Sequence, residues 1–165
     1  MRYTARVVLL GVVLGAACNR TPPAPAVAPP PFRPIADVKQ LMASVIEPAA
    51  DEYWDAVGSV VDAKGVKEFA PQTDDEWKAV RDSAYVFTEG GNLLMMSGRA
   101  KDTGEWMRLA QALVEVGQRA IKAAESKNSK AVFDAGAEVY DACVNCHSKY
   151  IVPGTAPAPP HKPGS

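Results

Sequence analysis

The distribution of proline limits what this chain can fold into more than any other feature of its sequence. Twelve of its 14 prolines lie in two flanks, 18–34 and 153–165, which favour extended polyproline II structure and can bury little apolar surface. Only Pro48 and Pro71 interrupt the sequence between the flanks. We therefore expect one folded domain over 35–152, carried on a Pro-rich tether and followed by a disordered Pro-rich tail.

The first 17 residues have the pattern of a secretory signal peptide. Arg2 and Arg6 precede the apolar run 7–14, which is too short to cross a membrane. We expect residues 1–17 to be removed on export. The mature chain is then expected in the periplasm or cell envelope.

Cys18 directly follows the small residues Gly15, Ala16 and Ala17. The sequence LGAAC over 14–18 resembles the lipobox of bacterial lipoproteins, in which the cysteine becomes the lipidated first residue of the mature protein. This resemblance implies that Cys18 is lipidated and anchors the domain to a membrane. Ordinary cleavage at the small residues, which leaves Cys18 as a free thiol, is the alternative.

Between the flanks, apolar residues recur at the three- and four-residue steps of amphipathic helices. The pattern predicts four helices, and Pro48 should kink the first around 44–47 or divide it in two. The irregular stretch 58–72 favours a long loop or small hairpin whose apolar residues fold back over an end of the helices. The predicted inward faces are Ile35, Val38, Met42, Val45, Ala49, Tyr53 and Ala56; Trp77, Val80, Ala84, Phe87, Gly91 and Leu94; Trp106, Leu109, Leu113, Val116, Ala120 and Ala124; and Val132, Gly136, Val139, Cys143, Cys146, His147 and Tyr150.

Two capping boxes are expected at helix starts. Thr73 and Glu76 can exchange side-chain and backbone hydrogen bonds at the start of the second helix, and Asp102 and Glu105 can do so at the third. The fourth helix is expected over about 129–150. Each start is thus marked by polar residues just before an apolar face begins.

The chemically most specific motif is Cys143-Val144-Asn145-Cys146-His147. A CxxCH sequence is the attachment pattern for c-type haem. Each thiol forms a thioether with a porphyrin vinyl group, and the neutral imidazole binds the iron. On a helix, Cys143 and His147 lie at i and i+4 with Cys146 beside them, so one face can carry both covalent links and the proximal ligand.

Three alternatives to haem attachment stay open for this motif, namely a chance pattern, a structural zinc half-site and a thioredoxin-like dithiol. Zinc requires two further ligands, and the only remaining Cys and His residues are Cys18 and His161, both in the flanks. A thioredoxin-like dithiol lies at a helix N-terminus after a strand, in an alternating β and α pattern that this sequence lacks. Haem attachment agrees best with the export signal, since the resemblance of the motif to that of bacterial c-type cytochromes implies attachment outside the cytoplasm.

Four helices with a CxxCH motif at the end of the last one resemble the class II cytochromes c, which comprise the cytochrome c′ family and its low-spin relatives. The resemblance covers about 35–150. It implies an all-α fold, an antiparallel four-helix bundle with the haem motif at the end of the last helix. It also implies one covalent haem c in the bundle core, held by Cys143 and Cys146 with His147 as proximal iron ligand. Cytochromes c′ are often homodimers through their first two helices, which makes a homodimer one expectation here.

The sixth iron position has several candidates in the sequence, namely Met42, Met95, Met96, Met107 and His161. The segment 39–42 resembles the first-helix segment that supplies the distal methionine in low-spin class II cytochromes, so Met42 is the candidate distal ligand. A core methionine without a bond to iron is the alternative, because methionine is an adaptable core residue. The other methionines are interpreted as packing residues, and His161 as a solvated residue of the tail.

Charge and motif content narrow the expected function. Without residues 1–17 the chain has 16 basic and 19 acidic residues, a net charge of −3, and no basic stripe that would favour nucleic acid. No acid–base or nucleophile constellation adjoins the haem motif, so we expect no enzyme activity. One-electron transfer with redox partner proteins of the cell envelope is the leading hypothesis. A gas-binding haem protein for nitric oxide or carbon monoxide, and a haem-free thiol or structural lipoprotein, are the alternatives.

Overall fold

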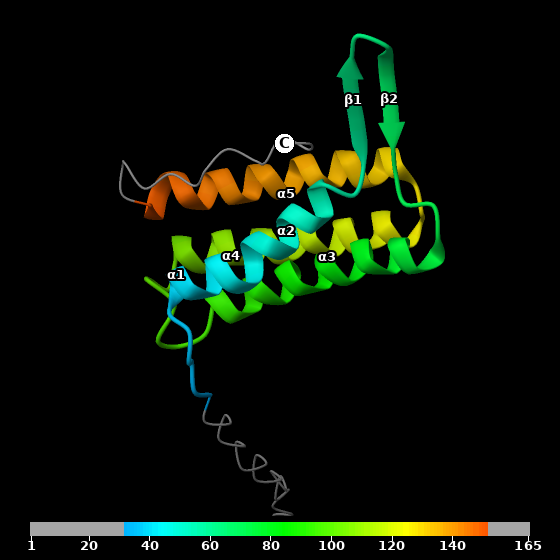
Figure 1. Ribbon diagram of the computed structural model, residues 1–165. Helices are drawn as coiled ribbons and strands as arrows, with labels where there is room; N and C mark the ends of the chain where they lie inside the picture. The colour runs from blue at the N-terminus through cyan, green and yellow to red at the C-terminus, as the bar shows by residue number, and fades with distance from the viewer. Residues whose placement is uncertain (1–31, 152–165) are drawn as a thin grey trace, which may run out of the picture. The chain divides into compact units, whose positions relative to one another are not determined.

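The computed structural model describes residues 32–151 (Figure 1). Within them the chain is mostly helical, with one small two-stranded sheet. The all-α class expected from the sequence is confirmed at this level. Several predicted features lie outside the described residues, namely the signal peptide 1–17, the lipidation site Cys18, the Pro-rich tether up to residue 31, His161 and the tail 153–165.

Pro48 shapes the first helical region, which has three parts: α1 (Val38–Leu41), the π-helical segment η1 (Met42–Ile46) and α2 (Glu47–Trp54). Proline has no N–H, and its ring clashes with the carbonyl four residues back, so a regular α-helical ladder cannot continue through this point. The N–H of Glu47 donates instead to the carbonyl of Met42, five residues back. The irregularity predicted around 44–47 is confirmed, and its form is a wider helical turn.

The π-helical turn changes which residues face the core. Leu41 and Ile46 lie five positions apart and are only 2% and 3% exposed, although the predicted inward face includes neither. Met42, which the predicted face includes, is half-buried. Ile35 precedes the helix and is 90% exposed. The predicted inward face of this region is therefore wrong at Ile35 and misses Leu41 and Ile46. Val38, Met42 and Val45 are half-buried and pack against the core as predicted.

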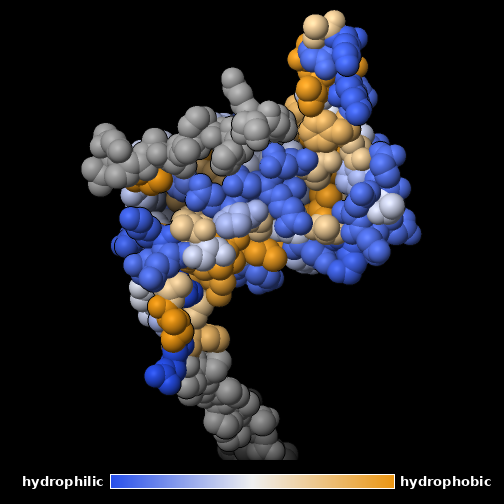
Figure 2. Space-filling view, in the orientation of Figure 1, coloured by the Kyte–Doolittle hydropathy of each residue, from blue (hydrophilic) through white to orange (hydrophobic). Residues whose placement is uncertain are grey.

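An antiparallel hairpin, β1 (Gly58–Asp62) and β2 (Gly65–Phe69), connects α2 to α3. It extends away from the helices in Figure 1, and its surface carries apolar residues in Figure 2. Val61 and Val66 lie opposite each other in the ladder and are 74% and 69% exposed. The hairpin is confirmed. The expectation that its apolar residues fold back over the helices is wrong for Val60, Val61 and Val66, whereas Phe69 and Ala70 at its base are half-buried and Ala70 packs against the core. The two strands, joined by a two-residue turn, pair with each other along their whole length.

Helix α3 (Asp74–Leu94) begins with the predicted capping box. The Thr73 hydroxyl accepts the Glu76 N–H at 3.2 Å, and the Glu76 carboxylate accepts the Thr73 N–H at 2.9 Å. The carboxylate also accepts the N–H of Gln72 at 2.6 Å. The Gln72 and Thr73 amides together hold the pKa of Glu76 below its ordinary value.

Helix α4 (Glu105–Glu125) begins differently from the prediction. Asp102 accepts the N–H groups of Gly104 at 2.9 Å and of Trp106 at 3.0 Å. Glu105, however, pairs with Arg108 at 2.6 Å one turn later instead of reaching back. The expected capping box of Asp102 and Glu105 is therefore wrong, because an opposite charge on the same helix face is the stronger partner for Glu105.

The remaining predicted inward faces of α3 and α4 are buried. Helix α3 packs antiparallel against α4, and α4 against α5 (Ser129–Tyr150) (Figure 1). Two adjacent glycines of α3 allow close packing: a Cβ on Gly90 would lie 2.5 Å from Ile46 Cγ1, and one on Gly91 would lie 2.8 Å from Val114 Cγ2. The largest fully buried side chains are Tyr53, Phe87, Val132 and Val139.

Candidate haem-attachment site

Helix α5 carries the CxxCH motif in its last two turns and has the bounds that the sequence predicted. Cys143 and Cys146 are free thiols, and both are half-buried, as is His147. Their spacing places the three side chains on one helix face, as expected. They are less buried than Val139, which lies one turn earlier and is 1% exposed. The apolar face of α5 therefore opens toward solvent where the motif begins.

Helix α2 covers the first part of α5. The indole N–H of Trp54 donates to the carbonyl of Gly136 at 2.9 Å, and a Cβ on Gly136 would lie 3.0 Å from Trp54 Cδ1. The Trp54 ring also meets Tyr140 edge to face, with centroids 6.1 Å apart. We call residues 129–140 the closed half of α5, and residues 141–150 the open half.

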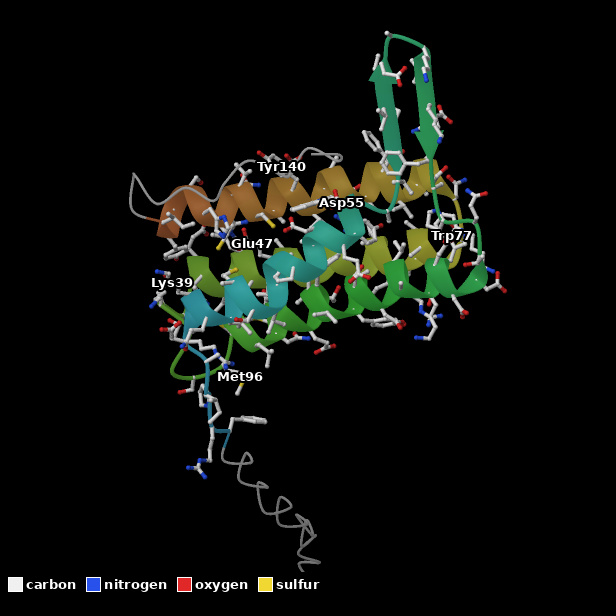
Figure 3. All side chains as sticks on the ribbon, viewed as in Figure 1. Lys39, Glu47, Asp55, Trp77, Met96 and Tyr140 are labelled. Carbon is white, nitrogen blue, oxygen red and sulfur yellow. The ribbon has the colours of Figure 1, made fainter. Side chains whose placement is uncertain are left out.

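Glu47 at the start of α2 lies toward the open half (Figure 3). Burial lowers the pKa of His147, while the negative charge of Glu47 acts on it in the opposite direction. The lowered pKa keeps the imidazole neutral, which is the form that binds iron. Sequence reasoning missed Glu47, because its proximity to His147 depends on how α2 packs against α5, and no local spacing marks it.

The two thiols of the motif are held in their protonated form. Burial raises the pKa of Cys143 to about 11, and the neighbouring Cys146 adds to this shift. Burial also raises the pKa of Cys146. The motif lies near the C-terminus of α5, where the helix dipole disfavours negative charge. A redox dithiol needs a thiol with a lowered pKa, so these surroundings disfavour a thioredoxin-like role for the motif.

The last turn of α5 is fixed to the connection between α3 and α4. The Tyr150 hydroxyl donates to the Asp102 carboxylate, and the Tyr150 ring meets Trp106 edge to face at 4.9 Å. The indole N–H of Trp106 in turn donates to the carbonyl of Leu94 at 2.8 Å. The hydrogen bond to Asp102 raises the pKa of Tyr150 to about 12 and lowers that of Asp102. The motif is thus held from both sides, by Trp54 before it and by Tyr150 after it.

The candidate sixth ligands occupy different parts of the structure. Met42 opens η1, is half-buried and packs against the core. Met95 and Met107 are also half-buried and pack against the core, in agreement with the interpretation as packing residues. The sulfur of Met96 accepts a hydrogen bond from Arg99 Nη1 at 3.3 Å. Of these methionines, only Met42 belongs to the helical region that contains Glu47. The role of Met42 as the sixth iron ligand stays a prediction.

Within residues 32–151, no group of three or more His, Cys, Asp or Glu side chains is placed to hold a metal ion. Among the helices of that same range, none is long and apolar enough to cross a membrane. In comparisons with known proteins, no protein family model, no curated protein and no solved structure matches this chain.

Proposed function

We propose that this chain is an exported c-type cytochrome that carries one covalent haem c and transfers single electrons in the cell envelope. The observation that carries the proposal is the half-buried face of α5, on which Cys143, Cys146 and His147 lie together as two free thiols and an imidazole. The haem would supply an iron atom that changes its oxidation state by one electron.

The surroundings of these side chains fit that group. Thioether attachment requires two reduced thiols, and Cys143 and Cys146 are both free and half-buried. Axial ligation requires a neutral imidazole, which the lowered pKa of His147 favours. No described residue hydrogen-bonds to the His147 ring, so both of its nitrogens stay available to a ligand or a solvent partner.

We also propose that the helices form an antiparallel four-helix bundle, in which α1, η1 and α2 act as one bent helix. The contacts of α2 support this arrangement. Tyr53 meets Phe87 of α3 edge to face at 5.7 Å, and its hydroxyl donates to the carbonyl of Ala120 in α4 at 3.1 Å. The next residue, Trp54, reaches α5. Two adjacent side chains thus join α2 to the other three helices.

The proposed location follows from the leader. Residues 1–17 serve as the signal peptide, and Cys18 carries the lipid that anchors the domain to a membrane, with envelope redox proteins as partners. Stable anchoring requires two or more acyl chains. Mass spectrometry of the mature N-terminus tests this part separately, since an unmodified Cys18 or cleavage at another bond contradicts it.

The test of the proposed function is expression of the full chain in a bacterium with haem-attachment machinery. We expect haem staining that survives denaturing electrophoresis, and its loss in a Cys143→Ser, Cys146→Ser double variant. Protein without such staining would refute the proposal. Addition of carbon monoxide to the reduced protein separates the two haem functions: no spectral change favours electron transfer, and rapid binding favours the gas-binding alternative.

A further inference from the structure

The outer face of α5 carries a row of exposed apolar side chains. Phe133, Ala137, Tyr140 and Val144 follow one another at i, i+4, i+7 and i+11, the spacing of a single helix face. Phe133, Tyr140 and Val144 are 64%, 47% and 44% exposed. We call these four residues the α5 strip. An exposed apolar row with polar borders is typical of an interaction surface.

Carboxylates border the α5 strip on the side of α2. Glu47, Asp51 and Asp55 follow at four-residue steps, so they form one row along that helix. This row lies beside Trp54, whose indole contacts Tyr140 of the strip. Figure 3 shows Glu47, Asp55 and Tyr140 on the same side of the molecule.

Two further carboxylates, Asp134 and Asp141, lie on α5 itself. Of the five bordering acids, Asp134 alone forms an ion pair with a described residue, Lys130, at 2.6 Å. The sequence of α2 contains no Lys or Arg. The other lysine of α5, Lys149, lies with Arg108 beside a different groove, between α4 and α5. The border of the strip is therefore strongly acidic, although the net charge of the whole chain is only −1.

We propose that the α5 strip and its acidic border are the docking surface for a redox partner protein with a positively charged face. This inference rests on the proposed function. Val144 of the strip lies between Cys143 and Cys146, so a partner seated on the strip would lie next to the haem. The apolar row supplies the contact area, and the carboxylates steer a lysine-rich face toward it and raise the association rate.

The same charges exclude other occupants. A second copy of the chain would bring five carboxylates against five, and like charges facing each other in an interface are unfavourable. An acidic partner is repelled for the same reason. A basic protein surface with an apolar centre is the occupant whose charge and polarity complement the strip.

The experiment measures how tightly lysine peptides bind to the haem-loaded full chain. Titration calorimetry gives the affinity at low and at high salt. The first probe is hexalysine, which tests the acidic border. An Asp51→Asn, Asp55→Asn, Asp141→Asn variant should bind hexalysine about tenfold more weakly at low salt, with little difference at high salt where surface charges are screened.

The matched control is a Glu89→Gln, Glu115→Gln, Glu125→Gln variant, which removes the same number of charges from α3 and α4. It should change the affinity for hexalysine less than about twofold, because these carboxylates lie away from the strip. Equal binding by the Asp51, Asp55 and Asp141 variant and the unchanged chain would overturn the docking surface.

The apolar row is tested with a second peptide, of sequence KKKWWKKK, which has the same six lysines and two central tryptophans. It should bind more tightly than hexalysine, and Phe133→Ser should remove that advantage. A dimer in sedimentation that Phe133→Ser dissociates would overturn the docking surface in favour of a second copy. Haem content is measured on the same samples. Absence of haem refutes the proposed function, whereas unchanged hexalysine binding in haem-loaded variants refutes the docking surface alone.

Discussion

The two halves of α5 share one amphipathic pattern but use it differently. In the closed half, Val132 and Val139 are each 1% exposed, and Gly136 lies directly under Trp54. In the open half, the two thiols and His147 are only half-buried. The inward-facing residues of 129–140 therefore pack against other helices, whereas those of 141–150 form a partly exposed, reactive face. Periodicity alone predicts which side of a helix is apolar, but it does not predict what covers that side.

The largest expected difference between the halves is in stability. Tyr53→Ala should lower the free energy of unfolding by about 3–5 kcal/mol. The substitution removes a 1% exposed ring, and its hydrogen bond to Ala120, from the core beside the closed half. His147→Ala should lower the free energy of unfolding of the haem-free chain by less than about 1 kcal/mol, because its ring is half-buried. Urea denaturation of the haem-free variants measures both effects.

Tyr53→Phe is the control for the ring itself. It keeps the packing and removes only the hydroxyl, so a loss of about 1 kcal/mol is expected. If His147→Ala destabilised the haem-free chain as much as Tyr53→Ala, the open half would be part of the structural core and the distinction between the halves would fail.

The second prediction concerns the open half with haem bound. If Met42 is the sixth ligand, Met42→Ala should convert a low-spin absorption spectrum to a high-spin one and admit carbon monoxide, because the iron loses its axial sulfur. Met107→Ala, which truncates another half-buried methionine, should leave the spectrum unchanged. A wild-type protein that is already high-spin, or an unchanged Met42→Ala spectrum, removes Met42 from the mechanism.

The third prediction returns to the closed half. Gly136→Val should lower the free energy of unfolding by about 1–3 kcal/mol, because the new side chain displaces Trp54 and breaks its hydrogen bond to the Gly136 carbonyl. Ala137→Val adds a branched side chain at the next, exposed position and should cost less than about 0.5 kcal/mol. Urea titrations with tryptophan fluorescence measure both. Equal losses would mean that Trp54 does not close this half.

Much of the helical fold was predictable, because the apolar spacing in α3, α4 and α5 follows the 3.6-residue period without interruption. The first helical region was less predictable. Pro48 indicated where the helix is disturbed, but the burial of Leu41 and Ile46 depends on the extra residue of the π-helical turn. The hairpin was recognisable from its turn residues, whereas the exposure of Val61 and Val66 was not, because an apolar strand residue ordinarily indicates a buried face.

The residues of the candidate site also differ in how far the sequence predicts them. Cys143, Cys146 and His147 were predictable because a local spacing defines them. Trp54 and Glu47 were not, because their relation to α5 depends on contacts between helices far apart in the sequence. A tryptophan and a carboxylate are ordinary residues of a helix, and no spacing marks them as neighbours of the motif.

The smallest expected effect lies at the end of the open half, where the Tyr150 hydroxyl donates to Asp102. The pKa of Asp102 is lowered, first of all by this hydrogen bond. Its contribution to stability is therefore present above the ordinary carboxyl pKa of about 4 and is lost as the pH falls through the lowered value. The pKa of Tyr150 is raised to about 12. Its contribution is present below the ordinary value of about 10 and is lost as the pH rises through the raised value.

Tyr150→Phe should remove the contribution of Tyr150 and reduce that of Asp102, whose carboxylate keeps the Gly104 and Trp106 amides, while the edge-to-face contact with Trp106 stays. Plotted against pH, the urea midpoint of the variant should fall less steeply than that of the unchanged chain in acid and above a pH of about 10. Hydrogen exchange should become faster only in the last turn of α5, because the closed half keeps its contacts. Tyr140→Phe is the matched control, since the Tyr140 hydroxyl bonds to no residue within 32–151. Parallel pH curves for Tyr150→Phe and the unchanged chain would show that Asp102 does not hold the end of α5.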